Sequence, residues 1–114
     1  MKKKQETYEL RARIFKALSH PSRLMIVDAL QEGPRMVGDL VDLVGAEYAT
    51  VSNHLAKLKQ AGIVAEDRKE KNHVYYRLEV TCIGGFFTCV GDVLSQRKKA
   101  LDGEMKKKRR TRAR

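Results

Sequence analysis

The chain has 114 residues, a formal net charge of +10, and hydrophobic side chains at 42% of its positions. This length suits one domain with a small core, which dimerisation commonly enlarges, and no internal repeat indicates a second domain. No apolar run is as long as a signal peptide or a membrane span, so we expect a cytoplasmic protein. Two cysteines without an export signal favour free thiols over a structural disulfide.

The excess positive charge lies at the two ends of the chain. Residues 5–104 hold fourteen basic and fourteen acidic side chains, which leaves three lysines before them and seven basic residues after them. We therefore predict a basic extension over residues 1–5, a folded domain over residues 6–104 and a disordered basic tail over residues 105–114. The tail is either a flexible electrostatic arm for nucleic acid or a solubilising segment.

The first half of the domain is predicted to form three helices. Apolar residues recur at helical spacing over residues 6–18, and Pro21 suits the first turn of a second helix over residues 21–30. A turn over residues 31–34 separates this helix from a short third one over residues 36–44. Each helix offers one apolar stripe for burial.

Residues 50–62 form the most informative segment of the chain. Val51, Leu55 and Leu58 make one apolar stripe, and Gly62 stands where the helix would end. The opposite face carries short polar side chains first and lysines further along: Thr50, Ser52, Asn53, Lys57 and Lys59. Polar groups near a helix N-terminus can reach base edges, and lysines further back can reach phosphates. With its short link to the preceding helix, this segment predicts a helix-turn-helix.

A β-hairpin and a last helix follow. Residues 63–67 and 73–78 have strand character, and the charged residues 68–72 between them predict a turn. A hairpin placed after a helix-turn-helix is a wing. A last helix is expected over residues 81–100. The predicted fold class is therefore mainly α with a two-stranded β-wing, a winged helix-turn-helix of about five helices.

Three linked motifs resemble the ArsR/SmtB family of winged-helix repressors over about residues 8–100. They are LSHPSRL at 18–24, VSNHLAKLKQAGIV at 51–64 and VYYRL at 74–78. The resemblance implies a homodimer that pairs through its first and last helices and represses until an inducer binds. It also implies a double-stranded DNA operator with an imperfect inverted repeat, whose half-sites lie about 10 bp or a multiple apart.

The resemblance further implies which residues contact DNA. The recognition helix would direct toward the major groove Tyr48, Ala49, Thr50, Ser52 and Asn53, with Lys57 nearer a phosphate. The wing would place along the backbone or the minor groove Arg68, Lys69, Lys71 and Asn72. His54 lies at a position of the family signature, where it either contacts DNA or supports packing of the helix.

The inducer sites of better-known family members are not expected here. Many arsenic sensors carry Cys-x-Cys just before an Asp-Leu in the third helix, where this chain has MVG at 36–38. Zinc sensors carry an Asp-x-His at the start of the last helix and a further His, where this chain has Val80, Cys82 and Val93. Aliphatic side chains cannot replace these ligands.

Cys82 and Cys89 remain as candidate inducer residues. Both fall in the predicted last helix, about 10.5 Å apart along its axis, which is too far for a disulfide within one chain. If two last helices pair antiparallel near Gly85, Cys82 of one chain approaches Cys89 of the other, and Gly84 and Gly91 permit a close approach. Such thiol pairs could bind a thiophilic ion such as As(III), undergo oxidation or reactive-sulfur chemistry, or lie in the interface as inert apolar residues.

An enzyme is not expected, because the sequence shows no nucleophile–base pairing, phosphate-binding glycine loop or carboxylate pair. No cofactor is expected to be required, and His20 and His73 are expected to be structural or solvent-facing. The remaining alternative is a ligand-independent architectural DNA binder. That protein would show weak sequence preference, whereas a specific repressor would bind a defined operator and lose its response when both cysteines become serine.

Overall fold

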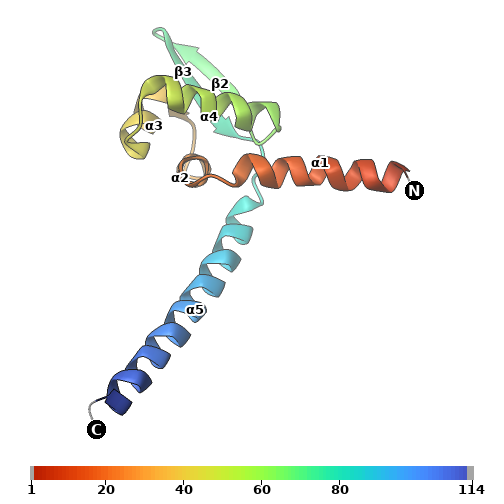
Figure 1. Cartoon of the computed structure of the whole chain (residues 1–114). Helices are drawn as coiled ribbons and strands as arrows, with labels where there is room; N and C mark the ends of the chain where they lie inside the picture. The colour runs from red at the N-terminus through yellow and green to blue at the C-terminus, as the bar shows by residue number, and fades with distance from the viewer. Residues whose placement is uncertain (1, 113–114) are drawn as a thin grey trace. The chain divides into compact units, whose positions relative to one another are not determined.

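The computed structural model describes the backbone of residues 2–112 and the side chains of residues 3–105. Its elements follow in this order along the chain (Figure 1): α1 (Lys2–Leu18), α2 (Pro21–Leu30), β1 (Arg35–Met36), α3 (Val37–Val44), α4 (Tyr48–Gln60), β2 (Val64–Glu70), β3 (His73–Leu78) and α5 (Ile83–Arg112). They fall into two compact units, of which the first ends at Thr81 and the second begins at Cys82. Over this described part, five helices and a β-hairpin agree with the predicted fold class.

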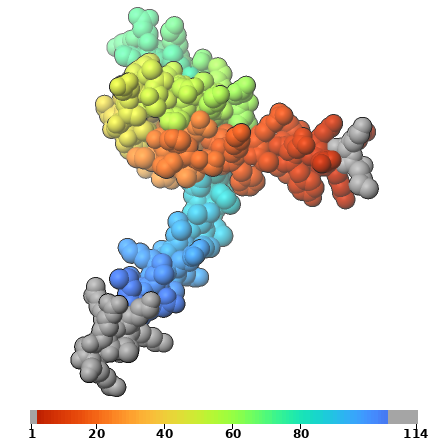
Figure 2. All heavy atoms as spheres, viewed as in Figure 1, coloured from red at the N-terminus to blue at the C-terminus, as the bar shows by residue number. Residues whose placement is uncertain are grey.

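The core of the first unit lies between α2, α3, α4 and the sheet. α4 contributes Val51, Leu55 and Leu58, which are fully buried, as the predicted apolar stripe requires. Further fully buried side chains are Ile26, Val27, Leu40, Ile63 and Val64. Figure 2 shows α2 and the end of α1 packed against α3 and α4. Burial of this stripe decides which face of α4 stays exposed.

Local signals set where α2 and α3 begin and end. Pro21 occupies the first turn of α2, and Nδ1 of His20 accepts a hydrogen bond from the backbone N–H of Ser22 at 3.1 Å. Gly45 ends α3 with a φ of 71°, a left-handed conformation that glycine adopts without strain. Because only residues 45–47 connect α3 to α4, these helices form the predicted helix-turn-helix.

The sheet has three strands, so the prediction of a two-stranded wing was incomplete. Its strand order is β1–β3–β2, with antiparallel pairing throughout. Arg35 of β1 pairs with Tyr76 of β3, and Met36 pairs with Tyr75. A strand of two residues is too short to show alternation, and its only signal is the distant strand with which it pairs. The pairing ties the start of α3 to the wing.

The turn of the wing is tighter than predicted. β2 continues to Glu70 and β3 starts at His73, so only Lys71 and Asn72 form the turn, with φ angles of 51° and 66°. Two left-handed residues in a two-residue hairpin loop are the geometry of a type I′ turn. The predicted turn over residues 68–72 therefore belongs mostly to β2. Arg68, Lys69 and Glu70 are paired strand residues, and only Lys71 and Asn72 are loop residues.

α5 belongs to the second unit. It begins at Ile83, so Cys82 precedes the helix, whereas the sequence predicts this cysteine inside it. α5 continues to Arg112, through residues that the charge pattern assigns to a disordered tail, and α1 begins at Lys2, within the predicted extension. The side chains of residues 106–114 lie outside the described residues. The division into extension, domain and tail therefore stays a prediction.

Large apolar side chains are exposed on several helices, most of them on α1 and α5. On α1 they include Tyr8 and Leu10, and on α5 they include Val90, Val93 and Leu94. Where such exposed side chains form a contiguous patch, they commonly mark a surface that binds another protein. None of the described helices has the length and apolar character needed to cross a membrane.

Candidate nucleic-acid interface

The exposed face of α4 carries the side chains predicted to read DNA. Tyr48 is 61% exposed, and the four other predicted residues are exposed as well: Ala49, Thr50, Ser52 and Asn53. Within the described part of the chain, the last three make no side-chain hydrogen bond. Their donors and acceptors are therefore available to a ligand. The structure brings these residues together at the N-terminal end of α4, and we call them the polar cluster: Tyr48, Ala49, Thr50, Ser52 and Asn53.

His54 lies on the buried side of α4. It is 6% exposed, and its Nδ1 accepts a hydrogen bond from Nε of Arg23 at 3.1 Å. The ring centroid of His20 is 4.4 Å away. Burial lowers the pKa of His54, and the nearby His20 and Arg23 lower it further. His54 therefore supports the packing of α4 on α2, and its inclusion among the DNA-contacting residues stays a prediction.

The wing presents mixed charge. Arg68 stacks over the ring of Tyr75 at 4.1 Å and forms ion pairs with Asp67 at 2.9 Å and Glu70 at 3.2 Å. The other predicted wing contacts are also exposed: Lys69, Lys71 and Asn72. Neither of these two lysines forms an ion pair with a described residue. Arg68 must exchange a carboxylate for a phosphate before it can hold DNA. Lys69 and Lys71 need no such exchange.

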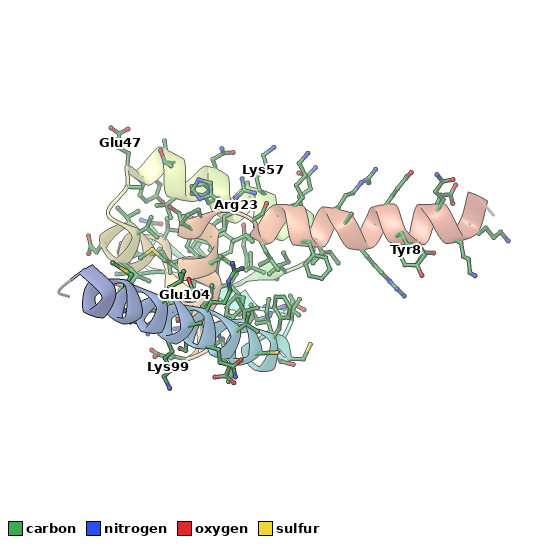
Figure 3. All side chains as sticks on the ribbon, turned by 60° about the horizontal axis from the view of Figure 1, so that its bottom comes forward. Tyr8, Arg23, Glu47, Lys57, Lys99 and Glu104 are labelled. Carbon is green, nitrogen blue, oxygen red and sulfur yellow. The ribbon has the colours of Figure 1, made fainter. Side chains whose placement is uncertain are left out.

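Two lysines follow the polar cluster on α4. Lys57 is exposed and lies about one turn beyond Asn53, on the same face. Lys59 forms an ion pair with Glu66 of β2 at 3.3 Å. Figure 3 places Lys57 and Arg23 where α1, α2 and α4 meet. Of the two lysines, Lys57 has the free charge and the position that a phosphate contact needs.

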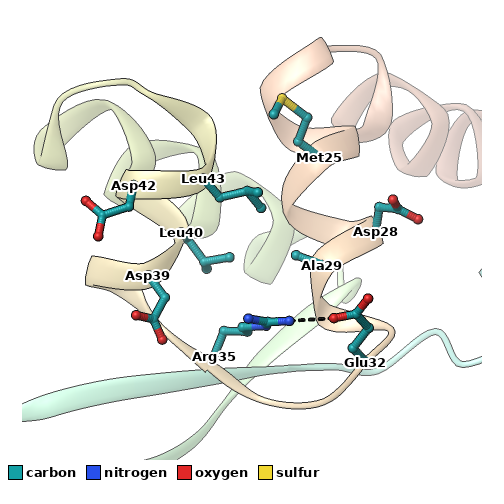
Figure 4. Close-up of a pocket in the computed structure, with 9 residues that line it drawn as sticks. All are labelled: Met25, Asp28, Ala29, Glu32, Arg35, Asp39, Leu40, Asp42 and Leu43. Atoms are coloured by element: carbon teal, nitrogen blue, oxygen red, sulfur yellow. Dashed lines mark hydrogen bonds and ion pairs between the residues drawn. The ribbon is translucent and has the colours of Figure 1, made fainter.

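A groove between α2 and α3 has the opposite character (Figure 4). Its volume is about 530 Å³, and Met25, Leu40 and Leu43 form its apolar wall. The acidic side chains that line it are Asp28, Glu32, Asp39 and Asp42. The arginine in this lining, Arg35, contacts Glu32 at 2.6 Å. The net negative charge repels phosphate, so this face does not belong to the DNA interface.

Cys82 and Cys89 are both free and exposed. Cys82 directly precedes α5, and the helix rises about 9 Å between Ile83 and Cys89. A disulfide needs Cα atoms within about 7 Å, so an intrachain bond would require Cys82 to fold back along the start of α5. Among the described residues, no three His, Cys, Asp or Glu side chains gather as a potential metal site. The two thiols are accessible but form no metal cluster there.

Comparison with known proteins identifies the family. Residues 20–66, from the start of α2 into β2, match the family described as bacterial regulatory protein, arsR family. The HTH-type transcriptional regulator Rv0081 of Mycobacterium tuberculosis is 36% identical over 90 residues, which cover 78% of each chain. The chain belongs to the ArsR family. This ArsR protein is therefore a DNA-binding transcriptional regulator and not an enzyme, as the sequence predicts.

Solved structures similar to this ArsR protein agree in fold, and a further relative is similar in sequence. The crystal structure of Rv0081 has a TM-score of 0.71 at 34% identity, covering 82% of this chain and 94% of that one. The solution structure of the homodimeric winged helix-turn-helix domain Mb0332 from Mycobacterium bovis has a TM-score of 0.74 at 30% identity, covering 88% and 92%. The biofilm growth-associated repressor of Xylella fastidiosa is 43% identical over 67 residues, 59% of this chain and 58% of that repressor. The predicted winged helix-turn-helix fold is confirmed.

Sequence reasoning missed the role of Arg23. This residue lies in the LSHPSRL motif, but its partner His54 is 31 residues further along the chain. The available signal was an arginine near the start of a helix whose following residues are apolar. Such a side chain needs an internal acceptor when its helix packs against another, and the sequence does not say which one.

Proposed function

We propose that this ArsR protein is an operator-specific transcriptional repressor that acts as a homodimer. The observation that carries the proposal is the exposed polar cluster at the start of α4, the second helix of a helix-turn-helix. Asn53 is the strongest candidate for a base contact, because an amide can form a bidentate pair with adenine in the major groove. The similarity to the Xylella fastidiosa repressor supports repression as the outcome of binding.

The operator is expected to be an imperfect inverted repeat. A two-fold dimer presents two copies of α4, so the half-sites would lie about 10 bp or a multiple apart. Lys69, Lys71 and Asn72 would follow the backbone or the minor groove beside each half-site. Lys57 would contact a phosphate and so fix the position of α4 without reading sequence.

Two copies of the chain are proposed to pair through α1 and α5. Leu10 of α1 is 58% exposed and Val90 of α5 is 40% exposed, and a partner would bury both. A Cβ at Gly85 or Gly91 would meet no described atom within 4 Å, so packing inside the protomer does not require these glycines. Glycine within a helix costs about 1 kcal/mol relative to alanine, and close approach of a second α5 would offset that cost. The homodimeric relative Mb0332 supports this assembly.

We further propose that the inducer acts at Cys82 and Cys89. Antiparallel pairing of two α5 helices near Gly85 would bring Cys82 of one protomer close to Cys89 of the partner subunit, forming two symmetric thiol pairs. The exposure of both thiols supports their reaction with a solute. A bond across the pair would change the relative orientation of the two recognition helices and weaken operator binding.

Two kinds of inducer fit a thiol pair. A soft ion such as As(III), or another thiophilic metal ion, prefers sulfur ligands, but with two protein thiols it would need a third ligand from solution. An oxidant or reactive sulfur species needs only two thiols, which give up two electrons and two protons as the S–S bond forms.

Operator binding measured by fluorescence anisotropy tests the proposal. The DNA upstream of the gene would be titrated with the complete reduced protein, alone and with arsenite, cadmium or a persulfide donor. We expect tight binding to this DNA, weaker binding to a random duplex, and release by one of the three reagents. Cys82→Ser and Cys89→Ser should bind as tightly as wild type and resist release.

The outcomes separate the parts of the proposal. Release that persists in both serine variants would overturn the thiol site and leave the repressor intact. Equal affinity for the upstream DNA and the random duplex would overturn operator specificity and favour a ligand-independent architectural DNA binder. Under oxidation, a reducible cross-linked dimer should appear in wild type and be absent from either serine variant.

A further inference from the structure

A groove opens where the end of α1, the start of α2 and the end of α4 meet. Its volume is about 490 Å³. It is lined by side chains from all three helices: Arg13, Lys16, Ala17, Arg23, Lys57, Gln60 and Ala61. The groove lies entirely within the first unit of the chain. Its position next to Lys57 makes it continuous with the DNA-facing side of α4.

The charge of this groove, which we call the basic groove, is unbalanced. Four of its seven lining residues are cationic and none is acidic: Arg13, Lys16, Arg23 and Lys57. None of the four forms an ion pair with a described residue, whereas Arg68, Arg77 and Lys59 of the same unit all do. Cations that converge without a counter-charge repel one another, and a bound anion removes that repulsion.

Arg23 is held in place before any ligand arrives. Its Nε donates to Nδ1 of His54 at 3.1 Å, and its Nη1 donates to the backbone oxygen of Ala17 at 3.2 Å. Two of the arginine's three nitrogens are thus fixed by α1 and α4, and the third makes no bond within the described chain. A half-buried guanidinium fixed in this way loses little conformational entropy when it binds an oxyanion.

We infer that the basic groove holds a backbone phosphate of the operator, with Arg13, Lys16 and Arg23 extending the contact made by Lys57. The inference rests on the proposed DNA binding. A phosphodiester is favoured because Lys57 shares its helix face with Asn53, so a duplex read by the polar cluster continues toward the groove. The wing carries mixed charge, whereas all four cations of the basic groove lack an ion pair with a described residue.

The test compares two double variants of α1 in the complete protein. Arg13→Gln/Lys16→Gln removes two charges from the groove, and Lys4→Gln/Arg11→Gln removes two exposed charges elsewhere on the same helix. Affinity for the upstream DNA and for a random duplex is measured from about 50 to 200 mM salt. The slope of log K against log salt is negative, and each lost phosphate contact makes it shallower by about 0.9. We expect this loss, once per protomer, for the groove variant on both duplexes, and the wild-type slope for the control.

Single methylphosphonate substitutions locate the contact on the DNA. A neutral linkage at the contacted position should weaken wild-type binding more than binding by the groove variant, which keeps only Arg23 and Lys57 at that phosphate. Identical slopes for the groove variant and the control would overturn the inference, while sequence preference in wild type would still uphold the proposed function. Equal wild-type affinity for both duplexes would instead count against operator specificity alone. Calorimetric binding of pyrophosphate to the groove, with an unchanged DNA slope, would assign it to a free anion and also overturn the inference.

Discussion

Arg23 and His54 are joined by a hydrogen bond of 3.1 Å from Nε of the arginine to Nδ1 of the histidine. The bond links α2 to the recognition helix α4. Because Nδ1 accepts this bond, the proton of the neutral imidazole lies on Nε2. Arg23 also donates to the backbone oxygen of Ala17 in α1, so one guanidinium connects three helices. Loss of this connection would weaken the packing of the recognition helix α4 against α1 and α2.

The stability of the protein should decrease in mild acid because of His54. Its pKa in the folded state is lowered by burial and by the neighbouring His20 and Arg23, whereas the unfolded value is about 6.5. Below that pH the unfolded chain binds a proton that the folded chain resists, so the free energy of unfolding falls until the pH passes the folded pKa. Urea unfolding over a series of pH values measures this decrease.

Two histidine variants identify the source of this pH dependence. His54→Gln should remove the contribution below pH 6.5 and lower the free energy of unfolding at pH 8 by about 1 kcal/mol, since the hydrogen bond from Arg23 is weakened or lost. His73→Gln, at an exposed position of the wing, should keep the wild-type pH profile. An unchanged profile in His54→Gln would show that another group is responsible.

Asn53→Ala should reduce operator affinity by about 1–3 kcal/mol if the amide reads a base. Its side chain is exposed and makes no hydrogen bond within the described residues, so the fold should not change. Binding to a random duplex should stay the same. Gln31→Ala removes an exposed amide that follows α2 and bonds to Asp28 at 2.9 Å, and it provides a control outside α4. Equal losses on the operator and the random duplex would assign Asn53 to the backbone instead.

Val90→Glu should weaken the proposed dimer. Val90 is 40% exposed on α5, and its burial in an interface would contribute about 1.5–3 kcal/mol. A glutamate at this position would lose that contribution and would have to bury a charge. Sedimentation equilibrium should show the dissociation constant increase at least about tenfold. Gln96→Glu, also exposed on α5, adds the same charge outside the apolar stripe and should dimerise normally. A dimer unaffected by Val90→Glu would place the interface elsewhere.

Removal of residues 106–114 should flatten the salt dependence of DNA binding and preserve sequence preference. This segment carries seven basic side chains and no acidic one. If it acts as an electrostatic arm, the slope of log K against log salt should fall by about 0.9 for each phosphate it neutralises. An unchanged slope would indicate a solubilising segment. Loss of preference for the operator would contradict the arm, because an arm contacts phosphates and reads no sequence.

The amino-acid sequence by itself determined the winged helix-turn-helix. The stripe of Val51, Leu55 and Leu58 follows from periodicity. The start of α2 follows from Pro21, and the end of α3 follows from Gly45. These signals are local, because backbone conformation and amphipathic spacing act over a few residues. The same pattern predicted which residues of α4 face outward, and the structure exposes them.

The tertiary structure alone decided which distant side chains meet. The bond from Arg23 to His54 spans 31 residues, and the basic groove unites Lys16 of α1 with Lys57 of α4. The pairing of Arg35 with Tyr76 likewise has no local signal. No spacing rule connects such residues, because their separation in space is set by how the helices pack and not by the chain between them. The sequence therefore predicted a recognition helix, and packing decided what supports it and where further phosphate-binding charge lies.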